Sequence, residues 1–351
     1  MSKILHIITD TNFGGAGRYI TLIDEFLDQK DHDFYLMIPR GSQLKDHVHK
    51  MTVIEVDKIA DQSFSLGGLK ALRGAIKDLQ PDIIHTHGSL AGRMAGRLLN
   101  IKTVFTKHTL SQPASGLKLQ MKKVLHGLLK SKAIAVSKGA YHNLQVEGFK
   151  DKDISLIYNG VGDQDHDESA TVKGRLLMVG RLEPIKGPFD ALTSIKLLRD
   201  KYGDDFQLVL AGEGSLRQEM EERVKNQNLP VEFLGHVSDI HPLYASAHVV
   251  INTSQSEALP YAMIEAMSHS KPVVAFNIPG ITEVVVNGQT GHIVDYQDYD
   301  DFADCLHGLL TSDDLCHTMG RASRERVDQL FSVKQMIDKL MKVYEAMYES
   351  N

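Results

Sequence analysis

Two carboxylates, Glu257 and Glu265, lie eight positions apart in the stretch 254–267, which reads SQSEALPYAMIEAM. The apolar run 249–251 just upstream indicates a buried strand. Pro260 suits the first position of a helix, because the N–H that proline lacks would have no partner there. We therefore expect a strand, a short loop with Glu257, and a helix with Glu265 in its second turn. Amides at the start of such a helix favour anions, so the stretch suits a phosphorylated sugar.

A second charged motif is the loop GRLEPIKG at 180–187, between a predicted strand at 176–179 and a predicted helix at 188–198. It contains Arg181 and Lys186. Two cations in a short loop at the end of a strand favour an anion between them. A diphosphate is the natural candidate, because a guanidinium gives directional hydrogen bonds and an ammonium gives a point charge. The alternative is a surface loop whose cations are solvated.

A glycine-rich run, GGAGR at 14–18, follows the first predicted strand at 4–9 and precedes an amphipathic helix. Adjacent glycines let the backbone approach an anion closely, and the helix adds its positive end. A dinucleotide fingerprint would need glycine or alanine where Ile20 stands, and an acid after the second strand. An NADP site that uses Arg40 and a plain tight turn are the alternatives.

Histidines are numerous, with 17 in the chain, so a single one carries little information. His108 stands at the end of a predicted strand at 103–106, where a partly buried structural imidazole is the ordinary interpretation. His85 and His87 follow another strand and resemble a metal-binding pair. Because no acidic partner stands nearby at the spacing of zinc ligands, we predict no metal site.

Strand-like and helix-like apolar patterns alternate along the chain, which favours parallel sheets with helices on both faces. A polar, acidic stretch at 159–173 interrupts the alternation and is typical of a linker. We therefore expect an α/β protein with two doubly wound, Rossmann-like domains facing each other across a cleft, with ligands at the carboxyl ends of the strands. The predicted strands are 4–9, 34–38, 83–85, 103–106, 133–136, 176–179, 206–210, 231–234, 249–251, 273–276 and 292–294, and the predicted helices are 69–79, 90–99, 117–129, 140–146, 188–198, 216–224 and 333–348.

The composition is that of a globular protein, with 351 residues, 42% of them hydrophobic, and a formal net charge of −6. A pI near 6.3 argues against a globally basic nucleic-acid-binding protein. The two cysteines, Cys305 and Cys316, match no zinc motif and form no disulfide framework, which suits a reducing compartment. The N-terminal apolar run is too short for a signal peptide, and no stretch is long enough to span a membrane. We expect a cytoplasmic protein, or one bound to the inner face of a membrane.

Together these motifs resemble those of glycosyltransferase family 4, retaining enzymes with the GT-B fold. The resemblance covers nearly the whole chain and is strongest in its second half. One departure is Ala258-Leu259, where the family commonly has glycine and phenylalanine; this bears on the choice of sugar more than on the chemistry. The matching motifs are GGAGR at 14–18, His108, GRLEPIKG at 180–187, AGEG at 211–214, LGHVSD at 234–239, SEALPYAMIEAM at 256–267, PGITEVV at 279–285 and NGQTGHIV at 287–294.

The resemblance implies an acceptor-binding domain at 1–160, completed by a crossing helix at 332–351, and a donor-binding domain at 161–331. It implies a nucleotide-sugar co-substrate and no metal or other cofactor. The residues that would act in catalysis are His108 beside the sugar, Glu257 on a sugar hydroxyl, and Arg181 and Lys186 on the diphosphate. The other residues that would bind the donor are Gly14, Gly15, Leu259 and Pro260 near the diphosphate, Glu265 on the ribose, and Gly212, Gly214 and Val237 beside the nucleobase.

The function that this implies is transfer of a hexosyl unit, with retention, from a nucleotide sugar to a glycan or lipid-linked acceptor. The donor would be a UDP-sugar and the process cell-envelope or exopolysaccharide biosynthesis. A nucleotide-sugar epimerase or glycan phosphorylase of the same architecture, and an inactive sugar-nucleotide-binding relative, are the alternatives. The sequence identifies neither the sugar, the base nor the acceptor.

A further expectation concerns the segment 102–146, which holds eight lysines and no acidic residue. Within the stretch 116–132, four of these lysines lie in or next to the predicted helix at 117–129, together with seven apolar residues. A basic amphipathic helix can lie on an anionic bilayer. A core helix with a solvated lysine face is the alternative. These four lysines are 118, 122, 123 and 130, and the apolar residues are Leu117, Leu119, Met121, Val124, Leu125, Leu128 and Leu129.

Overall fold

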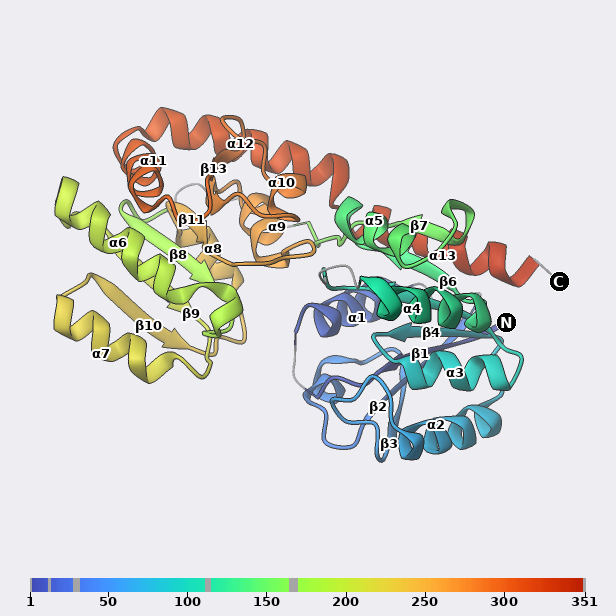
Figure 1. Cartoon of the computed structure of the whole chain (residues 1–351). Helices are drawn as coiled ribbons and strands as arrows, with labels where there is room; N and C mark the ends of the chain where they lie inside the picture. The colour runs from blue at the N-terminus through green and yellow to red at the C-terminus, as the bar shows by residue number, and fades with distance from the viewer. Residues whose placement is uncertain (1, 12–13, 28–31, 111–114, 164–169, 350–351) are drawn as a thin grey trace. The chain divides into compact units, whose positions relative to one another are not determined.

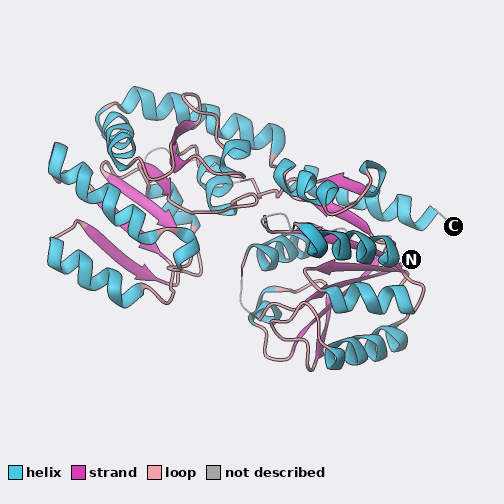
Figure 2. Cartoon of the chain, in the orientation of Figure 1, coloured by secondary structure: helices cyan, strands magenta, loops and turns pink. Residues whose placement is uncertain are grey.

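The computed structural model describes residues 2–11, 14–27, 32–110, 115–163 and 170–349. Its contacts divide the chain into unit 1, residues 1–162 with 333–351, and unit 2, residues 163–332. The boundaries predicted from sequence fall within two residues of these. Each unit is a parallel sheet with helices packed on it (Figures 1 and 2).

Unit 1 contains a seven-stranded parallel sheet in the order β3-β2-β1-β4-β5-β6-β7. The chain runs outward from β1 on one side and then restarts on the other side at β4, so the loops after β1 and β4 flank a switch point, where ligands of such sheets bind. The strands are β1 (Ser2–Ile8), β2 (His32–Pro39), β3 (Thr52–Val56), β4 (Ile83–His87), β5 (Lys102–Lys107), β6 (Lys132–Ala135) and β7 (Ile154–Leu156). The helices are α1 (Gly15–Phe26), α2 (Leu66–Leu79), α3 (Leu90–Leu98), α4 (Gly116–Leu129), α5 (Lys138–Val146) and α13 (Val333–Glu349), with short 3-10 turns at η1 (Gln43–His47) and η2 (Asp151–Asp153).

The last helix, α13, completes unit 1 by packing against α1 and β4. Its buried residues recur at helical spacing and include Met336, Leu340 and Tyr344. Near its end, Lys102 Nζ donates to the carbonyl of Met347 at 2.6 Å, where a cation stabilises the unpaired carbonyls of a helix terminus. The prediction that the C-terminal helix returns to the first domain is confirmed.

Unit 2 contains a six-stranded parallel sheet in the order β10-β9-β8-β11-β12-β13. It is wound like unit 1, and its switch point lies between β8 and β11. The strands are β8 (Arg175–Val179), β9 (Gln207–Ala211), β10 (Val231–Gly235), β11 (Val249–Asn252), β12 (Val273–Phe276) and β13 (Gly291–Val294). The helices are α6 (Pro188–Tyr202), α7 (Arg217–Gln227), α8 (His241–Ser246), α9 (Tyr261–Ser268), α10 (Ile281–Val284), α11 (Tyr299–Thr311) and α12 (Asp313–Leu330), with a 3-10 turn at η4 (Pro184–Lys186).

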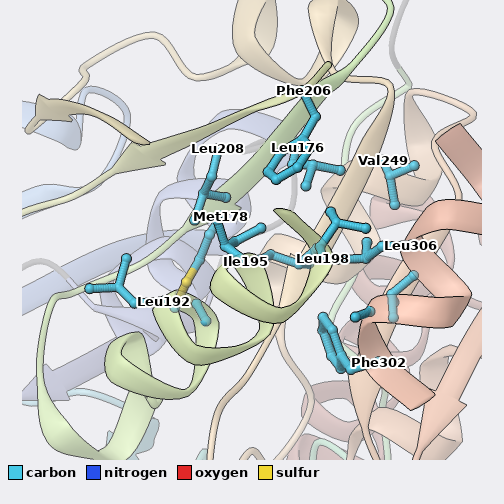
Figure 3. Packing of buried hydrophobic residues seen from close by; sticks show 14 of the residues in the cluster. Leu176, Met178, Leu192, Ile195, Leu198, Phe206, Leu208, Val249, Phe302 and Leu306 are labelled. Carbon is cyan, nitrogen blue, oxygen red and sulfur yellow. The ribbon is translucent and has the colours of Figure 1, made fainter. Parts of the chain in front are cut away.

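The core of unit 2 joins β8 to helices α6 and α11 (Figure 3). Leu176 and Met178 of β8 pack with Leu192 and Ile195 of α6, and Phe302 of α11 belongs to the same cluster. These side chains are at most 5% exposed. The apolar packing therefore fixes both ends of the 180–187 loop, which leaves β8 and enters α6.

The elements that were given no bounds from the sequence include β3, β7, α8, α10, α11 and α12. The strand β7 has only three residues, too few for a periodic signal. Helix α12 buries small residues, among them Gly320 and Ser323. A Cβ on Gly320 would lie 2.2 Å from the carbonyl oxygen of Ser270, so α12 packs by close backbone approach and carries few large apolar side chains.

Helix α4 turns its apolar face toward solvent, whereas a core helix buries that face. Leu117, Met121, Val124 and Leu128, spaced i, i+4, i+7 and i+11, are 63–77% exposed, and Leu129 alone in the helix is buried. The alternative of a core helix with a solvated lysine face is therefore wrong, because the apolar stripe faces solvent. None of the helices in the described ranges has the length and apolarity needed to cross a membrane.

Candidate functional site

The predicted donor-binding residues of unit 2 lie on loops at the carboxyl ends of adjacent strands. The loop 180–187 follows β8, the loop 212–214 follows β9, and the loop 253–260 follows β11. Val237 lies in the loop after β10. Because β8, β9 and β11 are hydrogen-bonded neighbours, the sheet brings these separate sequence motifs to one edge at its switch point.

Lys186 and Glu257 form an ion pair across this edge. Lys186 Nζ lies 2.6 Å from Glu257 Oε1, and the two side chains are 26% and 11% exposed. Ser254 Oγ donates to the same carboxylate oxygen at 2.8 Å. The other oxygen, Oε2, has no hydrogen-bond partner among the described residues. Sequence reasoning placed Lys186 on a diphosphate and Glu257 on a sugar, and the structure shows that the two side chains contact each other directly.

Arg181 lies five residues before Lys186 and is exposed. Its guanidinium has no hydrogen bond or ion pair with any residue in the described ranges. Glu183 of the same loop interacts electrostatically with Arg181. The loop therefore presents an exposed guanidinium near one acid, together with an ammonium that is paired with Glu257.

Backbone contacts hold the 180–187 loop against its neighbours. Gly187 has φ +61°, and a Cβ there would lie 2.0 Å from the carbonyl oxygen of Thr253. Thr253 Oγ1 donates to the carbonyl of Gly187 at 2.8 Å, and the amide of Gln255 donates to the carbonyl of Ile185 at 2.9 Å. Only glycine allows so close an approach in this backbone region.

Gly212 and Gly214 are required by the same kind of packing. Cβ atoms at these positions would lie 1.9 Å from the carbonyl oxygen of Gly180 and 2.3 Å from that of Leu182. The amide of Leu182 donates to the carbonyl of Glu213 at 2.9 Å. The packing of two loops thus accounts for both glycines, and the nucleobase contact assigned to them remains a prediction.

The segment with Glu257 and Leu259 is supported from β12. Gly280 has φ +90°, and a Cβ there would lie 2.4 Å from the carbonyl oxygen of Glu257. Pro260 is the N-cap of α9 and the helix begins at Tyr261. The prediction of Pro260 at the first helical position is therefore wrong by one residue, because its ψ of 116° is extended.

Glu265 lies in the second turn of α9, as predicted, and is 8% exposed. Its Oε2 accepts a hydrogen bond from Tyr244 Oη at 3.2 Å. Tyr244 comes from α8 and is fully buried. Its contact with Glu265 orients the carboxylate that we assigned to a ribose, and the local sequence around Tyr244 carried no signal of that role.

Two further polar residues of unit 2 were missed by sequence reasoning. Glu183 accepts from the amide of Ser215 at 2.9 Å and from its hydroxyl at 2.7 Å, which ties the loop after β8 to the loop after β9. Ser254 stands in the first stretch considered, where its spacing of three residues from Glu257 was the available signal.

In unit 1, the glycine-rich run forms the start of α1. Gly14 is the N-cap and Gly15 the first residue of the helix, while residues 12 and 13, just before the motif, lie outside the described residues. Gly14 has φ −124°, and a Cβ there would meet no atom within 4 Å. Neither the backbone conformation nor packing against the described residues requires glycine at position 14, and the predicted contact of Gly14 with the diphosphate stays a prediction.

His108 lies just after β5, partly exposed, with its Nε2 2.9 Å from His87 Nδ1. Burial lowers the pKa of His108 from 6.5 to about 3, so its imidazole is neutral near pH 7. His87 in turn contacts His6, and the nitrogen atoms of His6, His85 and His87 lie within 4.8 Å of one another. The sequence could not bring His6 to the later pair, and the prediction of no metal stays a prediction.

The chain matches two family models, one in each half. Residues 13–165 match the model described as Glycosyltransferase Family 4, and residues 164–326 match that described as Glycosyl transferases group 1. The chain is 26% identical to a UDP-Gal:alpha-D-GlcNAc-diphosphoundecaprenol alpha-1,3-galactosyltransferase of Escherichia coli, over 97% of this chain and 96% of that protein. It is 24% identical to the capsular polysaccharide biosynthesis glycosyltransferase CapM of Staphylococcus aureus, over 97% of this chain and 96% of the relative.

Among solved structures, the chain resembles Anabaena HepE in complex with UDP and glucose, with a TM-score of 0.83. The identity is 19%, and the match covers 99% of this chain and 100% of that one. The fold predicted from the sequence, two parallel-sheet Rossmann-like domains of the GT-B type, is confirmed.

Proposed function

The chain belongs to the glycosyltransferases of family 4, with the GT-B fold, and on this basis we propose that it is a retaining hexosyltransferase. Its donor is a UDP-sugar, and its acceptor is a glycan or a lipid-linked sugar of cell-envelope or exopolysaccharide biosynthesis. The E. coli relative named above acts on a diphosphoundecaprenol acceptor and the S. aureus relative in capsule biosynthesis, which supports this choice.

The observation that carries the proposal is the group formed by Arg181, Lys186 and Glu257 at the switch point of unit 2. The exposed guanidinium and the ammonium are placed to bind a diphosphate. Oε2 of Glu257 remains available to accept a hydrogen bond from a sugar hydroxyl, because Lys186 and Ser254 both bind Oε1. Glu265 lies on the helix that starts after the same loop, which suits a ribose.

In the proposed reaction, the bond between the sugar C1 and the diphosphate oxygen breaks, and a bond forms between C1 and an acceptor hydroxyl oxygen. The acceptor proton passes to the departing diphosphate. Negative charge grows on that diphosphate, so fixed cations and amides aimed at it lower the barrier. The resemblance to the family assigns Glu257 to a sugar hydroxyl and the neutral imidazole of His108 to the sugar.

A thermal-shift panel tests the donor. We expect UDP and one UDP-sugar to stabilise the protein and GDP and ADP to leave it unchanged. A ligand at 100 times its Kd adds about 2.7 kcal/mol to the free energy of unfolding. Stabilisation by GDP or ADP alone would overturn the choice of donor.

Product analysis tests the reaction itself. With the stabilising donor and a lipid-linked acceptor, NMR of the product should show the anomeric configuration of the donor. An inverted product would contradict retention. An isomerised sugar nucleotide formed without acceptor would favour the epimerase alternative, and donor turnover at background rate would favour the inactive relative.

We also propose that α4 binds an anionic bilayer, where lipid-linked acceptors lie. Its exposed apolar stripe is flanked by lysines, the arrangement of an interfacial helix. Lys122 forms an ion pair with Glu147 at 3.0 Å, and Lys107 forms one with the same carboxylate at 2.9 Å. Fewer lysines of the segment 102–146 therefore carry an unpaired charge than the sequence alone indicates. Lys118, Lys123 and Lys130 have no ion-pair partner among the described residues. The protein would then act as a peripheral protein on the inner face of the membrane.

A further inference from the structure

Unit 1 holds a row of imidazoles that begins at the partly exposed His108 and leads through buried histidines into the sheet. His6 comes from β1 and His87 from β4, and they are 0% and 3% exposed. His108 Nε2 lies 2.9 Å from His87 Nδ1, and His87 Nε2 lies 3.1 Å from His6 Nδ1. Both ring nitrogens of His87 are therefore occupied by neighbouring histidines.

The row continues through the C-terminal helix. Tyr344 of α13 is fully buried, and its Oη lies 3.2 Å from His6 Nε2 and 2.6 Å from His85 Nδ1. The other nitrogen of His85, Nε2, lies 2.7 Å from Thr106 Oγ1. Four histidines, one tyrosine and one threonine thus form a continuous line of contacts within hydrogen-bond distance.

The protonation states restrict how this line can be arranged. Burial lowers the pKa of His6 and His108 to about 3, lowers the pKa of His85 and His87 well below 6.5, and raises the pKa of Tyr344. All four imidazoles are therefore neutral near pH 7. A neutral imidazole has one N–H donor and one nitrogen acceptor.

Because both nitrogens of each inner histidine are used, each of these rings donates once and accepts once. The hydroxyl of Tyr344 has one hydrogen to donate. When it donates to one of its two histidines and accepts from the other, all donors point along the row in the same direction, and two arrangements of the row exist. In one, His108 Nε2 accepts and its Nδ1 carries the proton; in the other, Nε2 donates and Nδ1 is an acceptor.

We propose that this row is a hydrogen-bonded wire that sets the tautomer of His108, with Tyr344 as its positioning residue. Nδ1 is the one ring nitrogen of His108 that the wire leaves for a substrate. Whether it offers a donor or an acceptor depends on the direction of the hydrogen bonds along the row, in which Tyr344, more than two hundred residues away in the chain, joins His6 to His85. The contribution to catalysis rests on the proposed function, whereas the wire itself does not.

Nuclear magnetic resonance of histidine-labelled full-length protein tests the wire, because ring ¹⁵N shifts distinguish N–H from bare nitrogen. We expect one neutral tautomer of His108, assigned by comparison with His108→Gln. Tyr344→Phe keeps the ring but removes the hydroxyl shared by His6 and His85. The His108 signals should then change to those of a tautomer mixture. Tyr348→Phe, on the same helix at a 54% exposed position, is the matched control and should leave them unchanged.

Two results would overturn the proposal. Unchanged His108 signals in Tyr344→Phe would show that the row does not transmit its arrangement. Stoichiometric zinc binding by the wild-type protein, lost in His85→Asn, would show that His6, His85 and His87 are metal ligands and not members of a wire.

Steady-state kinetics of the same variants test whether the wire contributes to catalysis. Tyr344→Phe should lower kcat about tenfold, the effect of losing one well-placed hydrogen bond, with the KM for the donor unchanged. If the tautomer of His108 changes in Tyr344→Phe but kcat does not, the row acts as a wire but has no role in catalysis. If Tyr344→Phe does not fold, Thr106→Val interrupts the wire at its other end, and Thr106→Ser restores the hydroxyl.

Discussion

Lys186 has two anionic partners in the proposed reaction, Glu257 before the donor binds and the diphosphate afterwards. Its ion pair with Glu257 is partly shielded from solvent, with 26% and 11% of the two side chains exposed. Removing one member of a partly buried pair leaves the other charge uncompensated. The charge at position 186 therefore affects both the diphosphate and the carboxylate that orients the sugar.

Lys186→Ala should reduce turnover by about 100- to 1,000-fold, because one preorganised donor to developing charge contributes about 3–4 kcal/mol. The protein should stay folded, since the side chain lies in a loop outside the core. Steady-state kinetics and circular dichroism provide the measurement. Lys196→Ala, which removes an exposed i,i+4 pair on α6, is the control. A near-normal turnover rate in a folded Lys186→Ala protein would contradict the assignment of Lys186 to the donor diphosphate.

The buried histidines make unit 1 sensitive to acid. His6 has a pKa of about 3 in the folded state and 6.5 in the unfolded chain, so the unfolded state binds more protons between these values. The free energy of unfolding therefore falls as the pH drops below 6.5, by up to about 1.4 kcal/mol per pH unit for each such histidine.

Hydrogen exchange at pH 7.5 and pH 5.5, corrected for the intrinsic pH dependence of exchange, measures this effect. Amides of β1 and β4 should lose more protection at the lower pH than those of β8, which serve as the comparison. Unit 2 also holds a histidine whose pKa is lowered by burial, His248 beside β8, so β8 should show a smaller loss of protection. In His6→Gln the loss should be smaller than in the wild type. Equal losses in β1 and β8 would count against the buried histidines as the cause.

At the scale of elements, the loops of the site were largely predictable and their supports were not. The loop 180–187 was placed between a strand and a helix because the apolar patterns on both sides were strong. Tyr244 and Gly280 act through contacts with residues distant in sequence, and no local pattern reports such contacts. The predicted helical position of Pro260 was wrong by one residue, because the N-cap and the first helical position both accept a residue that has no N–H.

Gly280→Ala tests whether the turn after β12 positions Glu257. Its Cβ would lie 2.4 Å from the carbonyl oxygen of Glu257 and 2.7 Å from that of Ala258, so the loop must shift. We expect a loss of about 1–3 kcal/mol in the free energy of unfolding and a clear fall in turnover. Gly288→Ala is the matched control, since its φ of +74° carries the same strain but a Cβ there meets nothing within 4 Å.

The two Gly→Ala variants are compared in urea unfolding and in steady-state kinetics. Backbone strain alone should lower the stability of both variants by similar amounts. A selective fall in turnover for Gly280→Ala would locate the effect at the Glu257 loop. Equal turnover in the two variants would show that the turn does not position Glu257.

At the scale of the whole chain, two similarly wound units carry different chemistry. Unit 2 presents the cation loop, and unit 1 presents a neutral histidine, a glycine at a helix start and an exposed apolar stripe. The wound sheets were predictable because nearly every strand is a short apolar run. The direction of the α4 stripe was not predictable, because an amphipathic pattern does not say which of its faces meets solvent.

The exposed apolar stripe on α4 predicts that the protein binds to a membrane surface. Burying its leucines in a bilayer should contribute about 1.5–3 kcal/mol per side chain, and each nearby lysine about 1 kcal/mol on an anionic surface. The protein should therefore co-sediment with vesicles of phosphatidylglycerol and phosphatidylcholine at low salt, and the bound fraction should fall as salt screens the lysines.

Leu117→Ser should weaken binding to these vesicles about tenfold or more, with no loss of protein stability. Leu66→Ser is the matched control, because Leu66 on α2 of the same unit is also 77% exposed but lies outside the stripe. Absence of binding at low salt, or equal losses in both variants, would show that α4 is not the membrane-binding surface.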